Sequence, residues 1–178
     1  MRDPTRRSTL RAAGVALLGP LVGCSALPTE SAESEGLTFE RLDTTGVYAA
    51  DEVELSMPPE IETVDATHNA DLLLLPDNTN VDPERAVKWF ADDRVIALLG
   101  DSSEATWLSW ARSDEFRDAF ENEGHSDSEP DPSLVVGAKT GLYVTTYRRS
   151  WSESPRDRDI LRALDEVLVA IEKKTPPE

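Results

Sequence analysis

Oxygen-bearing side chains follow two apolar runs in the middle of the chain, residues 72–75 and 95–99. They are Asp77, Asn78 and Asn80 after the first run and Asp101 and Ser102 after the second. In open α/β sheets, ligands sit beyond the carboxyl ends of the parallel strands, and oxygens from two adjacent loops could hold Ca²⁺ or Mg²⁺. Helix capping by Asp82 and Asp101, with Asp77 and Asn78 as turn residues, explains the same residue types without a ligand and is the interpretation we favour.

Ser102 is also a candidate nucleophile. The segment Gly100-Asp101-Ser102, directly after an apolar run, resembles the nucleophile block of the GDSL/SGNH hydrolases. The resemblance implies a histidine, in an Asp-x-x-His segment near the C-terminus, that takes the serine proton. Here the only downstream histidine is His125, and Asn122 stands where that pattern has Asp. Because the resemblance covers three residues, a serine hydrolase that uses Ser102, Asp101 and His125 is our alternative prediction.

Metal-ligating residues give no recognisable pattern. His68 stands near Asp65 and Asp71, but two histidines and one cysteine provide no zinc spacing. The acids of residues 127–131 alternate as in a calcium loop, yet prolines occupy positions where such a loop needs flexible residues. We therefore predict no metal and no cofactor.

Four arginines are concentrated near the C-terminus beside Trp151, namely Arg148, Arg149, Arg156 and Arg158. Arginine and tryptophan are common interface anchors, so this segment could contact an anion or the acidic face of a partner. The other interpretation is that these arginines pair with Asp157, Asp159 and the acids around them.

The first 24 residues have the features of an export signal. Four arginines precede an apolar run of eleven residues, 12–22, which spans only about 16 Å as a helix against a hydrocarbon core of roughly 30 Å. Residues 1–23 are therefore predicted to be a signal peptide. Arg6 and Arg7, with Leu10 and Arg11 behind them, resemble the twin-arginine export motif, although Thr9 replaces the usual aromatic residue.

The segment Leu21-Val22-Gly23-Cys24 resembles a lipobox. That resemblance implies that Cys24 is lipidated and becomes the mature N-terminus. Residues 24–36 would then comprise the lipidated cysteine and a tether of polar and acidic composition, which buries too little apolar surface to fold.

Acidic residues dominate the charge of the chain. Its 178 residues include 18 Lys+Arg and 35 Asp+Glu, for a net charge of −17. Removal of residues 1–23 takes away four bases and one acid, which leaves 14 against 34 and a net charge of −20. Such a chain is not expected to bind nucleic acid, because phosphate backbones are held by clustered Lys and Arg. Its acidity and its four lysines resemble proteins of halophilic archaea, in which concentrated salt screens the repulsion.

Residues 37–174 are expected to form one α/β domain, followed by a tail at 175–178. Residues 37–39 and 53–57 alternate as half-buried strands do. A strand at 72–75, a helix opened by Asp82 and Pro83, and a strand at 95–99 predict a parallel βαβ unit buried on both faces. A capping box at 101–104 predicts a helix that continues to Gly124.

Two further elements complete the predicted fold. Residues 134–138 and 142–147 form a hairpin around 139–141, and residues 154–171 carry one apolar stripe at helical spacing. The fold class is thus α/β, with a mixed sheet, a central parallel βαβ unit, a C-terminal hairpin and a C-terminal amphipathic helix. Residues 70–100 resemble the βαβ units of the class I glutamine amidotransferase-like group. Cys24 lies in the signal and cannot be their nucleophile, so no amidotransferase activity is implied.

Taken whole, the chain resembles the uncharacterised twin-arginine lipoproteins of halophilic archaea. This implies a protein held on the extracytoplasmic face of the cell membrane by lipid on Cys24, after handling by the twin-arginine translocase. We expect a non-enzymatic binding or accessory role, with residues 148–158 or the strand-end loops as the contact surface.

Overall fold

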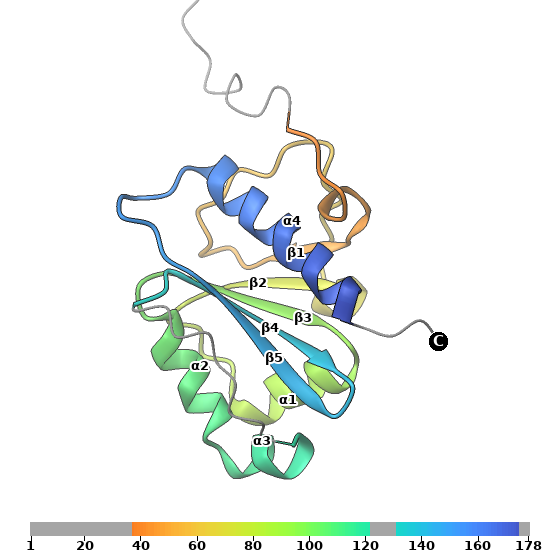
Figure 1. Cartoon of the computed structure of the whole chain (residues 1–178), viewed down its shortest axis with the longest axis vertical. Helices are drawn as coiled ribbons and strands as arrows, with labels where there is room; N and C mark the ends of the chain where they lie inside the picture. The colour runs from red at the N-terminus through yellow and green to blue at the C-terminus, as the bar shows by residue number, and fades with distance from the viewer. Residues whose placement is uncertain (1–36, 122–130, 175–178) are drawn as a thin grey trace, which may run out of the picture. The chain divides into compact units, whose positions relative to one another are not determined.

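A computed structural model describes residues 37–121 and 131–174. The chain divides into two units, Met1–Ala32 and Glu33–Glu178, and all described residues belong to the second. Its centre is a five-stranded sheet in the order β1-β2-β3-β4-β5 (Figure 1). The strands are β1 (Val47–Ala49), β2 (Leu72–Pro76), β3 (Val95–Leu99), β4 (Leu134–Thr140) and β5 (Tyr143–Arg149). The first three are parallel, and β4 and β5 are each antiparallel to the preceding strand.

Helices cover both faces of this sheet. On one face lie α1 (Pro83–Ala91), α2 (Ser103–Ala111) and α3 (Asp114–Ala119), and on the other lies α4 (Asp157–Lys174) (Figure 1). Two short 3-10 turns, η2 (Leu42–Thr44) and η3 (Thr67–Asn69), flank β1 and β2 in the sequence. The predicted fold class, a mixed α/β sheet with a parallel βαβ unit, a hairpin and a C-terminal helix, is confirmed.

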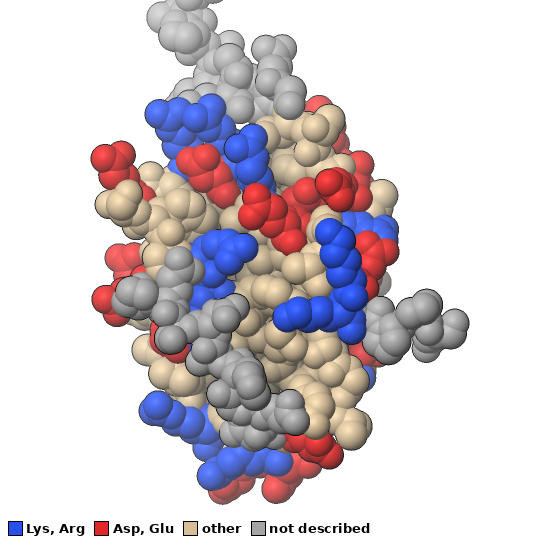
Figure 2. Space-filling view, viewed as in Figure 1, with Lys and Arg blue, Asp and Glu red and all other residues tan. Residues whose placement is uncertain are grey.

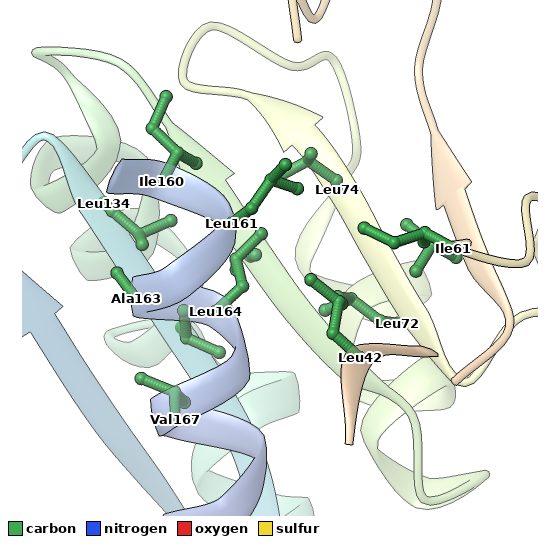
Figure 3. Packing of buried hydrophobic residues seen from close by; sticks show 13 residues of the cluster. Leu42, Ile61, Leu72, Leu74, Leu134, Ile160, Leu161, Ala163, Leu164 and Val167 are labelled. Atoms are coloured by element: carbon green, nitrogen blue, oxygen red, sulfur yellow. The ribbon is translucent and has the colours of Figure 1, made fainter. Parts of the chain in front are cut away.

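The alternate side chains of β2 enter two separate cores. Leu72 and Leu74 belong to the cluster with α4, whereas Leu73 and Leu75 belong to the cluster with α1, α2 and α3. Figure 3 shows Leu161 of α4 beside Leu74, and Leu42 beside Leu72. Because side chains of a strand alternate between faces, a run of four leucines is what a strand buried on both faces requires.

Local sequence signals explain several element boundaries. The carboxylate of Asp82 accepts a hydrogen bond from the backbone N–H of Arg85 at 2.8 Å, and Pro83 opens α1, as predicted. Gly141 has φ +70° at the turn between β4 and β5, where Thr140 pairs with Tyr143. A positive φ at the first residue of a two-residue turn favours glycine.

The strands predicted at 37–39 and 53–57 do not form. Their apolar side chains, including Phe39, Val53 and Leu55, pack against the α4 cluster from irregular backbone. The alternation therefore reflects packing onto the core without a strand ladder. The first strand is instead β1, three residues that pair with β2.

The single helix predicted from 101 to 124 is also wrong. The chain forms α2 and α3, separated at Ser113, whose hydroxyl accepts a hydrogen bond from the N–H of Phe116 at 3.1 Å and starts α3. The break reorients the chain, so that Phe116 and Phe120 pack against Phe90 of α1. Gly124 lies outside the described residues.

Candidate functional site

The carboxyl ends of β2 and β3 meet at one edge of the sheet, as the sequence predicts. There the carboxylate of Asp77 accepts a hydrogen bond from the backbone N–H of Ser102 at 2.7 Å, and its carbonyl accepts one from the hydroxyl of Thr106. Ser102 is the N-cap residue of α2, but its own side chain makes no capping bond. Asp77 therefore caps α2 from the neighbouring strand.

The predicted role of Asp101 as a helix cap is wrong, because Ser102 occupies the N-cap position and Asp101 is exposed one residue earlier. A physical reason is the backbone at Gly100, which has φ +134°. A Cβ there would lie 2.4 Å from Cγ of Asp77. The close approach brings the Asp77 carboxylate over the start of α2, where it takes the capping position.

An open cleft of about 460 Å³ lies at the carboxyl ends of β1 and β2, and we call it the strand-end cleft. Its walls are Ala50 and Glu52 after β1, Pro76 at the end of β2, residues 78–81 after β2, and Asp82 and Arg85 at the start of α1. Its volume lies within the range of small-molecule sites, and the crevice beyond strand ends is where α/β sheets bind ligands. Asn78 and Asn80, two of the residues singled out from the sequence, lie here.

Turns and a helix cap fix the strand-end cleft. The N–H of Val53 donates to the carbonyl of Ala50 at 2.9 Å, which closes a turn with Glu52 inside it. The N–H of Thr79 donates to the carbonyl of Pro76 at 3.1 Å and closes a second turn. The Asp82 cap fixes the first turn of α1, which carries Arg85.

Arg85 also lines a second cleft, of about 490 Å³. It is lined by Thr67 and His68 of η3 and by residues of α1 and the following turn, including Lys88, Trp89 and Arg94. The guanidinium of Arg85 lies 5.0 Å from the centre of the Trp89 ring. His68 is exposed, and its carbonyl accepts a hydrogen bond from Arg94 at 3.3 Å. Within residues 37–121 and 131–174, no three His, Cys, Asp or Glu residues are grouped so that they could hold a metal.

Ser102 is exposed at the start of α2, and its backbone N–H is already donated to Asp77. A serine hydrolase needs backbone donors aimed at the developing oxyanion, and this N–H is not free to serve as one. Asn122 and His125 lie outside the described residues.

Arg148 is not an accessible contact residue. It is 6% exposed, and its guanidinium donates to both carboxylate oxygens of Glu104 on α2, at 2.9 and 3.2 Å, and to the hydroxyl of Thr146 at 2.9 Å. This bidentate ion pair joins β5 to α2. Arg148 therefore follows the second interpretation of the arginine segment, in which the arginines pair with acids. Its partner, however, is neither Asp157 nor Asp159.

The other arginines of that segment also have acidic neighbours. Arg149 lies 3.9 Å from Glu166, Arg158 lies 3.8 Å from Asp159, and the backbone N–H of Arg156 donates to Asp159 at 3.2 Å. Trp151 is half-buried against the α4 cluster. Figure 2 shows Lys and Arg side chains in separate groups among the acids rather than in one basic patch.

Two sets of residues were not singled out from the sequence. Glu52 and Arg85 line the strand-end cleft, and only the three-dimensional pairing of β1 with β2 brings them to it. Asp165 of α4 is 9% exposed and accepts hydrogen bonds from three consecutive N–H groups, those of Glu40 at 3.1 Å, Arg41 at 2.9 Å and Leu42 at 2.9 Å. The sequence did contain a signal for Asp165, because an acid on the apolar face of the predicted helix indicates a carboxylate that needs hydrogen-bond partners.

The predicted export and lipidation residues Arg6, Arg7 and Cys24, and the tether to residue 36, lie outside the described residues. No described helix is both long and apolar enough to cross a membrane.

Comparison with protein-family models, with curated proteins and with solved structures finds no match to this chain. Its function is therefore inferred from its own residues.

Proposed function

We propose that this chain is a lipoprotein, anchored through Cys24 on the extracytoplasmic face of the membrane, whose α/β domain binds a small polar ligand in the strand-end cleft. The anchor part rests on the sequence: paired arginines, a short apolar run and a single cysteine directly after it. The binding part rests on one observation, the open polar cleft at the carboxyl ends of β1 and β2.

Amide and hydroxyl groups dominate the loop that follows β2. Asn78, Thr79 and Asn80 together offer donors and acceptors without a net charge. Ala50, Pro76 and Val81 add apolar wall. Six of the nine lining residues are polar or charged, so the cleft suits a polar ligand better than an apolar one.

The attachment of the domain to the tether also supports an anchored module. Asp165 fixes the backbone of residues 40–42 on α4, only a few positions after the predicted tether ends. The domain thus begins at a firmly bonded segment, so that residues 24–36 can act as the spacer between lipid and domain.

The anchor is tested by mass spectrometry of the mature N-terminus, with the full chain expressed in a halophilic archaeal host. We expect cleavage before Cys24 and a lipid on its sulfur, with the protein in the membrane fraction. Cys24→Ser should lose the lipid, and the pair Arg6→Lys and Arg7→Lys should leave the precursor inside the cell. An intact Met1 in the wild-type protein would contradict the anchor.

The binding role is tested by extracting small molecules from the purified protein. Wild-type protein should carry a polar solute that is depleted in Asn78→Ala/Asn80→Ala, while a control variant outside the cleft, Ser109→Ala, should carry it normally. Equal solute content in all three proteins would contradict a binding role for the strand-end cleft.

A further inference from the structure

Three charged residues line the strand-end cleft, namely Glu52, Asp82 and Arg85. Glu52 lies in the turn after β1, and Arg85 lies in the first turn of α1. Neither makes an ion pair with the other, or with any other residue of the described ranges.

The guanidinium of Arg85 has an aromatic neighbour and no acidic partner among the described residues. Several described cations pair with a carboxylate, as Arg148 does with Glu104, whereas Arg85, like Lys88 and Arg112, does not. The guanidinium lies over the ring of Trp89, which lines the second cleft, and this contact does not neutralise its charge. Asp82, which also lines the strand-end cleft, accepts the backbone N–H of Arg85 as the helix cap.

A ligand that pairs with both Glu52 and Arg85 carries an anionic and a cationic group. Its anionic end would accept from Arg85 and its cationic end would donate to Glu52, while the amides of Asn78 and Asn80 bond its polar atoms. A ligand with one charge would leave one of these two exposed side chains with water as its only partner.

We infer that the strand-end cleft binds a small zwitterion of the amino-acid class, with Arg85 holding its carboxylate and Glu52 its ammonium group. This inference rests on the proposed binding function and adds the chemical class of the ligand. The volume of about 460 Å³ accommodates such a molecule together with bridging water.

The test is isothermal titration calorimetry of the full chain, purified from membranes in detergent and concentrated salt. The probes are the twenty standard α-amino acids and the series glycine, β-alanine, γ-aminobutyrate and 5-aminovalerate, which varies the separation of the two charges. The tightest probe is then compared with its analogue without the amino group and its analogue without the carboxylate. We expect each analogue to bind at least roughly tenfold more weakly, since each loses a charge-assisted hydrogen bond.

Protein variants test the two named side chains. Glu52→Gln and Arg85→Gln should each weaken the tightest probe roughly tenfold. Lys88→Gln, a cation on the same helix outside this cleft, and Glu54→Gln, an acid in the same segment, should bind as the wild-type protein does. An unchanged melting temperature in each variant shows that the fold is intact.

Two results would overturn the inference. One is that no zwitterion binds, and the other is that a singly charged analogue binds as tightly as the zwitterion. If either occurs while the wild-type protein still carries a solute that Asn78→Ala/Asn80→Ala lacks, the binding function stands and only the ligand class is wrong. If that solute difference is absent as well, the proposed binding function fails with it.

Discussion

The carboxylate of Asp77, at the end of β2, caps α2 by accepting the N–H of Ser102 at 2.7 Å across 25 positions of sequence. The first N–H groups of a helix have no partner within it, and a carboxylate at that end also interacts favourably with the helix dipole. The contact therefore joins the βαβ unit to the next helix. Because the Asp77 carboxylate is used in this cap, it is not available to bind a ligand.

Asp77→Ala is expected to destabilise the domain by about 1 to 2 kcal/mol, because it removes a charged helix cap. Asp77→Asn keeps an acceptor oxygen and should cost less. The measurement is the free energy of unfolding from urea titrations at constant salt. Asp101→Ala serves as the control, because Asp101 is exposed and does not cap the helix. An equal loss in both alanine variants would contradict the assignment of the cap to Asp77.

The Arg148–Glu104 ion pair gives a second prediction. Glu104→Ala leaves a buried guanidinium with only Thr146 as a side-chain partner, and is expected to cost about 2 to 3 kcal/mol of unfolding free energy. Arg148→Met, which leaves the less buried Glu104 to water, should cost less than Glu104→Ala. Arg149→Met, at a neighbouring residue whose side chain is 43% exposed, should change stability little. Urea unfolding measures this ranking. If Arg148 were an accessible partner contact, Glu104→Ala and Arg148→Met would both change stability as little as Arg149→Met.

Asp165→Ala is expected to release the segment around residues 40–42 from α4. Three backbone N–H groups would lose a common acceptor, so their amide hydrogens should exchange much faster with solvent. Asp165→Asn should give intermediate exchange, since one amide oxygen remains. Hydrogen exchange followed by mass spectrometry measures this, with α1 as an internal control. Unchanged exchange at residues 40–42 would show that Asp165 does not hold the segment.

Local chemistry made much of the fold predictable. The four leucines of β2, the cap at Asp82 and the apolar stripe of α4 each depend on residues within a few positions, so their elements were predicted correctly. The same kind of reasoning failed at 53–57, where alternating apolar residues pack on the α4 cluster without a strand partner. An alternating pattern of apolar residues shows that one side of a segment is buried. A β-strand also needs a neighbouring strand whose backbone can pair with it.

The candidate site was predictable only in its location. The βαβ pattern predicts that Asn78 and Asn80 lie at the end of a strand. The roles of Asp77 and Glu104, in contrast, depend on contacts with residues distant in sequence. Asp77 is 25 positions from Ser102, and Arg148 is 44 positions from Glu104. Glu52 and Arg85 come together only because β1 pairs with β2, and β1 was not predicted.

The serine-hydrolase alternative predicts that the purified chain hydrolyses simple esters and that Ser102→Ala abolishes the activity. We expect no such dependence, because the N–H of Ser102 is already bonded to Asp77. The measurement is turnover of p-nitrophenyl acetate by the wild-type protein, Ser102→Ala and the control Ser109→Ala. Loss of turnover in Ser102→Ala alone would establish the alternative in place of the binding function, and His125→Ala would then identify the base.

The acid excess predicts that stability rises with salt. At about 0.1 M salt the screening length is about 10 Å, so exposed carboxylates repel one another, whereas at about 1 M it is roughly 3 Å and the repulsion is largely removed. The melting temperature should therefore rise over this range of KCl. A variant with five exposed acids changed to amides, Asp51, Glu60, Glu62, Glu115 and Asp118, tests the cause, since it removes charge without changing the core. Its melting temperature should depend less on KCl than that of the wild-type protein. Equal slopes would mean that salt acts through apolar burial, which responds to excluded solutes irrespective of charge.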